Sequence, residues 1–142
     1  MKRIYSTLML LAMMVAALSF TACGGDEDKI DGNTSSLVGT WKLLNMENYI
    51  QFKNDGSFIE ATNMDNFHGT WKVTGNTLLL SNDGRGYAMT FSIEIKSNKY
   101  LTMELLSYYF LSNPSDVFDY DNKDDTITYE KVNDSEIVKY IR

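Results

Sequence analysis

Cysteine is almost absent from this sequence of 142 residues, and its single example is Cys23. One cysteine cannot form an internal disulfide, and it cannot build a cluster of thiolate metal ligands. The stability of the folded chain must therefore come from the packing of its side chains.

Histidine is equally scarce, because His68 is the only one. Its place beside Gly69, at a predicted strand start, is typical of a surface or turn residue rather than a catalytic base. No serine lies in a Gly-x-Ser-x-Gly elbow, and no glycine-rich loop could cradle a phosphate. Glu94 and Glu104 fall on predicted outward faces, where solvated carboxylates are poor acid-base catalysts. We therefore expect no catalytic residue, no metal site, no cofactor and no enzymatic activity.

Basic residues are fewer than acidic ones. The sequence has 13 Lys and Arg and 19 Asp and Glu, which gives a formal net charge of −6. An acidic protein is repelled by the phosphates of nucleic acids and by anionic lipid head groups. We therefore expect no nucleic-acid partner.

Long apolar runs are absent except near the N-terminus, where residues 8–20 read LMLLAMMVAALSF. This run is shorter than the roughly 20 apolar residues that a membrane-spanning helix needs. It follows the basic residues Lys2 and Arg3 and precedes small residues, which is the pattern of a secretory signal. We predict that residues 1–22 are a signal peptide.

The end of this leader, Phe20-Thr21-Ala22-Cys23, resembles the lipobox of bacterial lipoproteins, in which cleavage occurs before a cysteine that carries a diacylglyceryl group. The usual leucine three residues before the cysteine is replaced here by another apolar residue, Phe20. The resemblance implies that Cys23 is lipidated and that the acyl chains anchor the protein to a membrane.

Residues 23–36 are polar and rich in glycine, aspartate, asparagine and serine, and we predict that they form a lipid-anchored flexible tether. The acidic residues Asp26, Glu27 and Asp28 resemble the export tag that directs some Gram-negative lipoproteins to the outer face of the outer membrane. This resemblance implies an outer-membrane lipoprotein displayed on the cell surface. The alternative is a solvated linker that its charge keeps extended.

The remaining residues, 37–142, are enough for one domain with a hydrophobic core. Their apolar residues recur with a period of two rather than with a helical period. Turn sequences such as Asn54-Asp55-Gly56 separate the apolar runs. We predict about eight strands, at residues 41–44, 49–53, 57–61, 70–73, 77–81, 87–95, 101–105 and 126–132.

Short strands joined by hairpin turns predict an all-β fold, a single antiparallel up-and-down barrel of about eight strands. A two-sheet β-sandwich is the alternative, because strand patterns alone do not distinguish closure from stacking. The sequence Gly-Thr-Trp-Lys occurs at residues 39–42 and again at 69–72. We interpret the pair as two strands that begin alike, each with a glycine that allows close backbone approach and a tryptophan that fills the interior. The tail, residues 137–141, is predicted to be a further strand or a helical turn.

The segment 37–43 resembles the first strand of the lipocalin-like superfamily, whose signature is Gly-x-Trp. Residues 52–58 and 69–78 are similar to the following strands of small bacterial lipocalin-like lipoproteins, and the resemblance covers residues 37–132. One departure is Lys131, which stands where lipocalins have an arginine packed over the signature tryptophan; a lysine lacks the guanidinium plane. The resemblance implies a lipocalin-like barrel domain that, as in some members, binds a small apolar molecule.

Two hypotheses for function follow. In the first, the barrel is hollow and takes a small hydrophobic ligand, whereas the alternative for the same side chains is a core that the barrel fills by itself. The candidate ligand-lining residues are Phe52, Phe58, Trp71, Leu78, Leu80, Met89, Phe91 and Met103.

In the second hypothesis, the protein is a surface-displayed interaction module that binds a protein or a glycan, or inhibits an enzyme. Its contact surface is the aromatic segment at residues 107–122, because exposed aromatic clusters mark interfaces. The same segment could instead form a lid over the mouth of the barrel or a short helix that plugs it. The candidate lid or interaction residues are Tyr108, Tyr109, Phe110, Phe118 and Tyr120.

Overall fold

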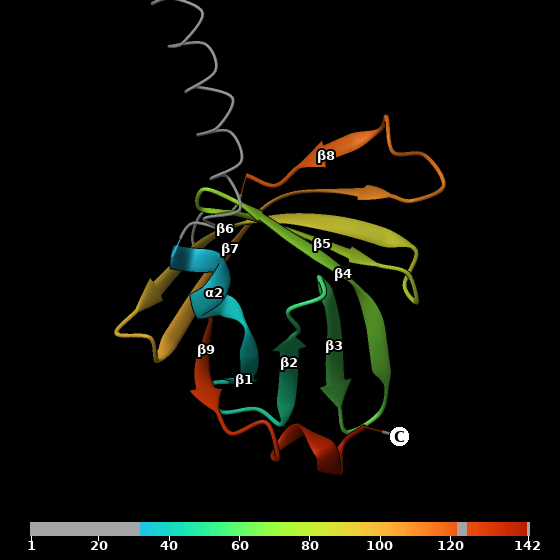
Figure 1. Ribbon diagram of the computed structural model, residues 1–142. Helices are drawn as coiled ribbons and strands as arrows, with labels where there is room; N and C mark the ends of the chain where they lie inside the picture. Colours follow the sequence, from blue (N-terminus) through green and yellow to red (C-terminus); the bar gives the residue numbers. More distant parts are fainter. Residues whose placement is uncertain (1–31, 122–124, 142) are drawn as a thin grey trace, which may run out of the picture. The chain divides into compact units, whose positions relative to one another are not determined.

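The computed structural model of the protein describes residues 32–121 and 125–141 (Figure 1). The predicted signal peptide, Cys23 and residues 24–31 of the predicted tether lie outside the described residues. The elements are α2 (Gly32–Leu37), β1 (Gly39–Leu43), β2 (Asn48–Phe52), β3 (Ser57–Thr62), β4 (Asn66–Thr74), β5 (Thr77–Asn82), β6 (Tyr87–Lys96), β7 (Tyr100–Phe110), β8 (Val117–Asp119), β9 (Thr126–Val132) and the 3-10 helix η2 (Ile137–Lys139).

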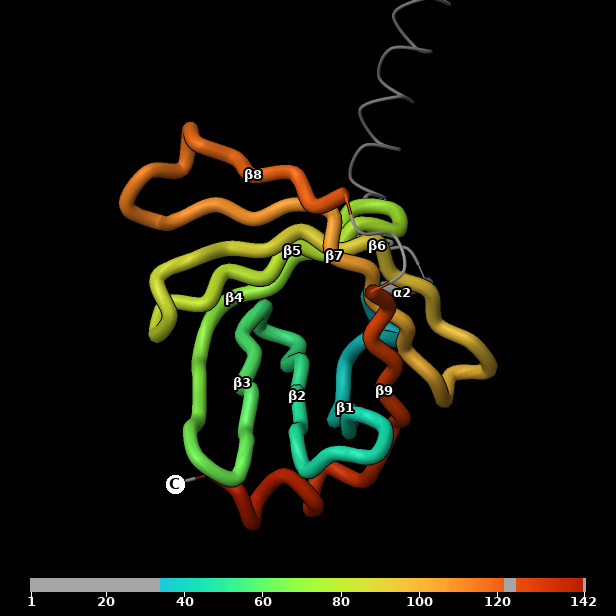
Figure 2. The backbone as a smooth tube through the Cα atoms, turned by 180° about the vertical axis from the view of Figure 1, so that it is seen from behind, coloured from blue at the N-terminus to red at the C-terminus, as the bar shows by residue number. Residues whose placement is uncertain are grey.

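Eight of these strands close into an antiparallel barrel (Figure 2). Strands β1 to β7 pair in sequence order, and β9 completes the ring by pairing with both β7 and β1. β8 is the extra strand and pairs with the end of β7. This closure confirms the predicted all-β, up-and-down barrel of about eight strands and excludes the two-sheet sandwich.

The barrel is closed by side chains at the end where β1 begins. Leu37 of α2 is fully buried in the core, and the Trp41 indole N–H donates a hydrogen bond to the Leu37 carbonyl oxygen at 2.7 Å. The Lys131 Nζ lies 5.0 Å from the centroid of the Trp41 ring and donates to the Ser36 carbonyl oxygen at 3.0 Å. Lys131 therefore covers the first-strand tryptophan.

The structure differs from the sequence prediction at this end, because residues 32–36, predicted to belong to a flexible tether, lie in α2. The repeated glycine Gly39 adopts a φ of 126°, a conformation that favours glycine. A Cβ atom there would also lie 3.1 Å from the Cε atom of Lys131. The start of β1 is thus shaped to admit the lysine stem.

The second copy of the repeated tetrapeptide lies inside a strand rather than at its start, which corrects the prediction. β4 begins at Asn66, so the exposed His68 and its neighbour Gly69 are already within the sheet. A Cβ atom at Gly69 would lie 1.9 Å from the Ser81 carbonyl oxygen, so the close backbone approach predicted for this glycine is confirmed. Trp71 is buried in the interior, as predicted.

The C-terminal tail forms the helical turn η2, which is one of the two predicted alternatives. Ile137 is buried against Tyr49 and Ala61 in a second, smaller apolar cluster. These two residues have the opposite strand parity to the core residues of β2 and β3, so η2 covers the outer face of these strands. None of the helices in the described ranges has the length and apolar character needed to cross a bilayer.

Candidate functional site

The eight side chains predicted to line a ligand cavity pack together in the centre of the barrel. Seven of them are buried members of one core cluster, and the eighth, Met89, packs against that cluster. The Phe52 ring lies 5.5 Å from Trp71 in an edge-to-face arrangement and 6.4 Å from Phe58, measured between ring centroids. The Trp71 indole N–H donates to the Lys53 carbonyl oxygen at 3.0 Å. These contacts are those of a packed core.

Loops gather at the end of the barrel opposite α2, because successive antiparallel strands alternate in direction. The β1–β2, β3–β4 and β5–β6 connections lie here, and we call this end the loop end. The Arg85 guanidinium lies 3.8 Å from the centroid of the Phe67 ring and 4.0 Å from the Glu60 carboxylate. It also donates to the Tyr87 hydroxyl at 3.1 Å. Arg85 thus joins the β5–β6 loop to β3 and β4.

Tyr129 is a buried titratable group on the inner face of β9. Its burial first, and the charge of Glu60 second, raise its pKa above the usual range for tyrosine. Sequence reasoning missed Tyr129 and Glu60 because neither residue belongs to a motif. The available signal was a glutamate with the same strand parity as the apolar Phe58.

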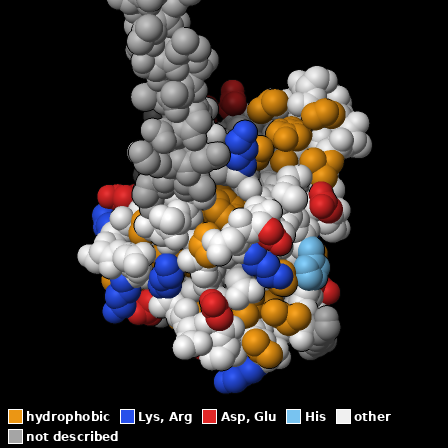
Figure 3. Space-filling model, viewed as in Figure 1, with side chains coloured by type: hydrophobic (Ala, Val, Ile, Leu, Met, Phe, Trp, Pro, Cys, Tyr) orange, Lys and Arg blue, Asp and Glu red, His pale blue; other side chains and the backbone are white. Residues whose placement is uncertain are grey.

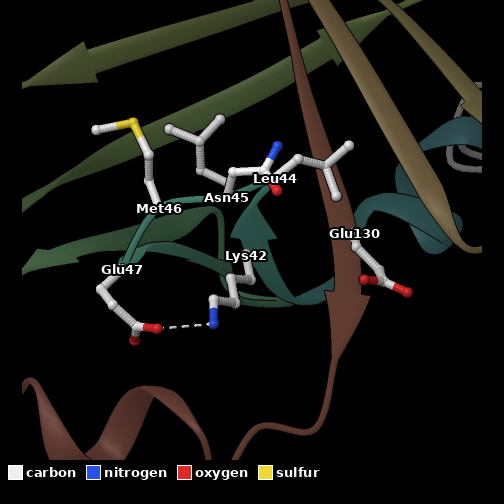
Figure 4. Close-up of a pocket in the computed structure, with 7 residues that line it drawn as sticks. Lys42, Leu44, Asn45, Met46, Glu47 and Glu130 are labelled. Atoms are coloured by element: carbon white, nitrogen blue, oxygen red, sulfur yellow. Dashed lines mark hydrogen bonds and ion pairs between the residues drawn. The ribbon is translucent and has the colours of Figure 1, made fainter.

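Two pockets open among the loops of this end rather than in the core. The first has a volume of about 470 Å³, and Figure 4 shows Lys42 and Glu47 pointing toward each other at its edge. It is lined by Lys42, Leu43, Leu44, Asn45, Met46, Glu47 and Glu130. The second has a volume of about 310 Å³ and is lined by Met46, Glu47, Asn48, Thr62, Asn63, Met64, Asp65, Phe67 and Arg85.

Glu47 is the most strongly hydrogen-bonded carboxylate of these loops. It accepts hydrogen bonds from the hydroxyls of Tyr140 and Tyr49, the latter at 3.0 Å, and from the Lys42 Nζ at 2.9 Å. The bond from Tyr140 contributes most, followed by those from Lys42 and Tyr49, and together they lower the pKa of Glu47 to about 2. The same carboxylate raises the pKa of Tyr140 to about 12. Because the Tyr49 and Tyr140 rings also stack at 4.9 Å, this network fastens the C-terminal tail to the barrel.

The predicted aromatic segment forms a β-hairpin that projects from the barrel in Figures 1 and 2. β7 runs to Phe110, five residues beyond its predicted end, and Tyr108 pairs with Phe118 of β8. The segment is therefore neither the plugging helix nor an irregular loop. We call β7 from Leu106 onward, the turn and β8 up to Asp121 the β7–β8 hairpin.

A β-bulge decides which face of this hairpin carries the aromatic rings. Phe91 pairs with Leu105, but its neighbour Thr90 pairs with Ser107, so Leu106 is an extra residue in β7. Met89 consequently pairs with Tyr108, and both lie on the same side of the sheet as the buried Phe91. The bulge thus places Tyr108, with Phe110 two residues later, on the face that continues the barrel interior.

Three rings on this face form an aromatic cluster, which we define as Tyr108, Phe110 and Phe118. The Tyr108 and Phe118 rings stack at 5.2 Å with an interplanar angle of 18°, and Phe110 meets them edge-on at 6.2 and 6.1 Å. Phe110 is nevertheless 50% exposed and Phe118 is 38% exposed. In Figure 3 hydrophobic side chains gather on the hairpin at the upper right. The rings thus contact one another while Phe110 and Phe118 stay exposed to solvent.

The other two predicted residues of this segment have different partners. Tyr109 pairs with Val117 on the opposite face of the hairpin. Tyr120 follows β8, and its hydroxyl donates to the Asp125 carboxylate at 2.8 Å. The ring contacts of the cluster join Tyr108, Phe110 and Phe118 of the five predicted residues.

Within residues 32–121 and 125–141, no group of three or more His, Cys, Asp and Glu side chains is arranged to hold a metal ion. Glu94 is exposed on β6, as predicted for an outward position.

Comparison with known proteins bears on the fold. Neither a protein-family model nor a curated protein matches the chain. Among solved structures, the crystal structure of Treponema pallidum Tp0751 (Pallilysin) is similar, with a TM-score of 0.51 and 9% sequence identity. The match covers 70% of this chain and 83% of that chain. At this identity the likeness concerns the barrel architecture alone.

Proposed function

We propose that this protein is a lipid-anchored, non-catalytic interaction module that binds another protein through the aromatic cluster of the β7–β8 hairpin. The observation that carries the proposal is the cluster itself, three rings that pack on one another on an extension of the sheet, with Phe110 and Phe118 exposed. Ordered, exposed aromatic side chains supply contact area at little cost in conformational entropy, which is why interfaces are enriched in them.

A protein partner suits the cluster better than a glycan does. Sugars stack on the open face of an aromatic ring, whereas Tyr108 and Phe118 turn faces toward each other. Phe110 stands edge-on to both rings. Such a cluster offers apolar ring edges, which accept aliphatic and aromatic side chains of a polypeptide.

A small apolar ligand inside the barrel has less support. The residues proposed to line its cavity contact one another in the core, and both pockets of the loop end lie among exposed loops. A small eight-stranded barrel can be filled by its own side chains. We therefore place the binding function on the surface.

The hairpin projects from the loop end of the barrel, opposite α2, because β7 runs from the α2 end toward the loops. The proposed anchor at Cys23 precedes α2 by nine residues in the sequence.

Native mass spectrometry of the lipoprotein, extracted with mild detergent from its own host envelope, tests the proposal. We expect the wild-type chain to carry a protein partner that a Phe110→Ser, Phe118→Ser double variant loses. The matched control is Met64→Ser, Val138→Ser, which changes two side chains that are 81% and 65% exposed elsewhere. A small apolar molecule retained by wild type and both variants, with no protein partner, would contradict the proposal and favour a hollow barrel.

A further inference from the structure

We infer that the open edge of β8 pairs with an extended, basic segment of the partner protein, in an antiparallel manner that adds a strand to the barrel sheet. The inference rests on the proposed function and specifies how the partner is recognised. Strand addition to an exposed sheet edge takes its affinity from main-chain hydrogen bonds and its specificity from alternate side chains.

The first step is that β8 has one unused edge. Among the described strands, β8 pairs with β7 alone. β8 and β9 pair with the same edge of β7. β9 pairs with the first part of that edge, from Tyr100 to Glu104. β9 is covered on its far side by β1, but β1 ends at Leu43, so no described strand covers β8. An uncovered edge presents a row of main-chain donors and acceptors.

The second step is which backbone groups face outward. The amide of Tyr120 donates to the Leu106 carbonyl oxygen at 2.8 Å, so this pair is hydrogen-bonded. In an antiparallel ladder, hydrogen-bonded pairs alternate with pairs that are not bonded. The bonded pair next along is Tyr108 with Phe118, which leaves the N–H and C=O groups of Val117 and Asp119 pointing away from β7.

The third step is charge. The hairpin, residues 106–121, contains Asp116, Asp119 and Asp121 and no lysine or arginine. In the described part of the chain, none of the ion pairs involves these three carboxylates. A segment that carries lysine or arginine would therefore meet uncompensated negative charge along β8.

The side-chain parity of β8 then sets the sequence pattern of the partner. Residues opposite Asp119 and Val117 face the side of the hairpin that carries the Asp119 carboxylate, and the residue opposite Phe118 faces the aromatic cluster. An extended segment in which basic and aliphatic residues alternate satisfies both faces. A second copy of this chain fits poorly, because its hairpin would bring three more aspartates to the same edge.

The probe for this inference is a synthetic peptide of alternating lysine and isoleucine, titrated against the mature chain with Cys23→Ser replacing the acylated cysteine. Opposite Asp119 the lysine amides of an antiparallel peptide hydrogen-bond to β8, whereas the isoleucine amides face solvent. We expect fluorescence anisotropy to show binding that N-methylation of the lysine amides weakens at least tenfold. N-methylation of the isoleucine amides, the matched control, should leave it within about twofold.

Variants of the protein test whether the peptide binds at the open edge of β8. Asp119→Lys should weaken the lysine peptide about tenfold and strengthen its glutamate counterpart, whereas Asp83→Lys, at an exposed loop position, should change neither by more than about twofold. Absence of binding at about 1 mM peptide, or equal binding of all three lysine peptides, overturns strand addition. If binding of the native partner still requires Phe110 and Phe118, that result leaves the proposed function intact. If the partner does not depend on these residues, the proposed function fails independently.

Discussion

Replacing Phe52 with alanine removes a ring from the middle of the packed interior, where Phe52 is 1% exposed and contacts Phe58 and Trp71. Loss of the buried apolar surface costs about 1.5–3 kcal/mol. The cavity that remains adds to this cost, so a Phe→Ala change in a tight core destabilises by about 3–5 kcal/mol. For a domain of this size the melting temperature should fall by roughly 10–25 °C.

Phe110→Ala provides the matched control, because it deletes the same atoms from a ring that is 50% exposed. Its cost should be about 1 kcal/mol or less. Urea denaturation followed by tryptophan fluorescence gives both values, and an unchanged m-value shows that the unfolded state is comparable. If Phe52→Ala costs no more than Phe110→Ala, the interior is not tightly packed, and the reasoning that moves function from the cavity to the hairpin is refuted.

Three further predictions concern the ends and walls of the barrel. Because the pKa of Glu47 falls to about 2 from 4.5, its stabilising contribution is present above pH 4.5 and is lost as the pH falls toward 2; Glu47→Gln should flatten this part of a plot of denaturation midpoint against pH, and an unchanged slope would speak against the network. Gly69→Ala should destabilise by about 2 kcal/mol or more in urea, since its Cβ would lie 1.9 Å from the Ser81 carbonyl oxygen. A loss as small as a few tenths would show that this wall is not closely packed. Lys131→Met keeps an apolar stem over Trp41 but removes the ammonium group. It should lower the free energy of unfolding by about 1 kcal/mol in the same assay. An unchanged free energy of unfolding would show that the ammonium group does not stabilise the fold.

The barrel could be predicted from the sequence because its local signals agree with its topology. Asn54-Asp55-Gly56 forms the expected turn, with Gly56 at a φ of 82° and Ser57 bonded to the Asp55 carboxylate. Each of the eight predicted runs overlaps a barrel strand. When every hairpin connects neighbouring strands, period-two patterning is sufficient to suggest the order of the sheet.

The sequence indicates that the aromatic segment is a candidate functional region, but it does not predict that the segment forms a hairpin. Leu105 and Leu106 are both apolar, so the sequence gives no indication that the second is an extra residue in a bulge. Without that bulge, Tyr108 would fall on the outer face and the cluster with Phe118 would not form on the side of the core. The choice depends on pairing with Thr90 and Phe91, about fifteen residues away in sequence, which a local pattern does not contain.

The close packing of the barrel interior could not be predicted from the sequence either. Phe52, Phe58 and Trp71 suit either a ligand cavity or a core, because both are lined by large apolar side chains. The distances between their rings settle how they are packed. The polar contacts of Arg85 at the loop end depend on three separate strands and carry no local signature.

The central claim is that the aromatic cluster contacts a protein partner in the native envelope, and site-specific photocrosslinking tests it most directly. A benzophenone amino acid at position 110 keeps an aromatic ring in the cluster, and the same residue at the exposed Lys72 on the outer face of β4 serves as the control. The account predicts one discrete protein adduct from position 110 in intact cells, none from position 72, and loss of the adduct when Phe118→Ser is added. Adducts from both positions, or from neither, would contradict it.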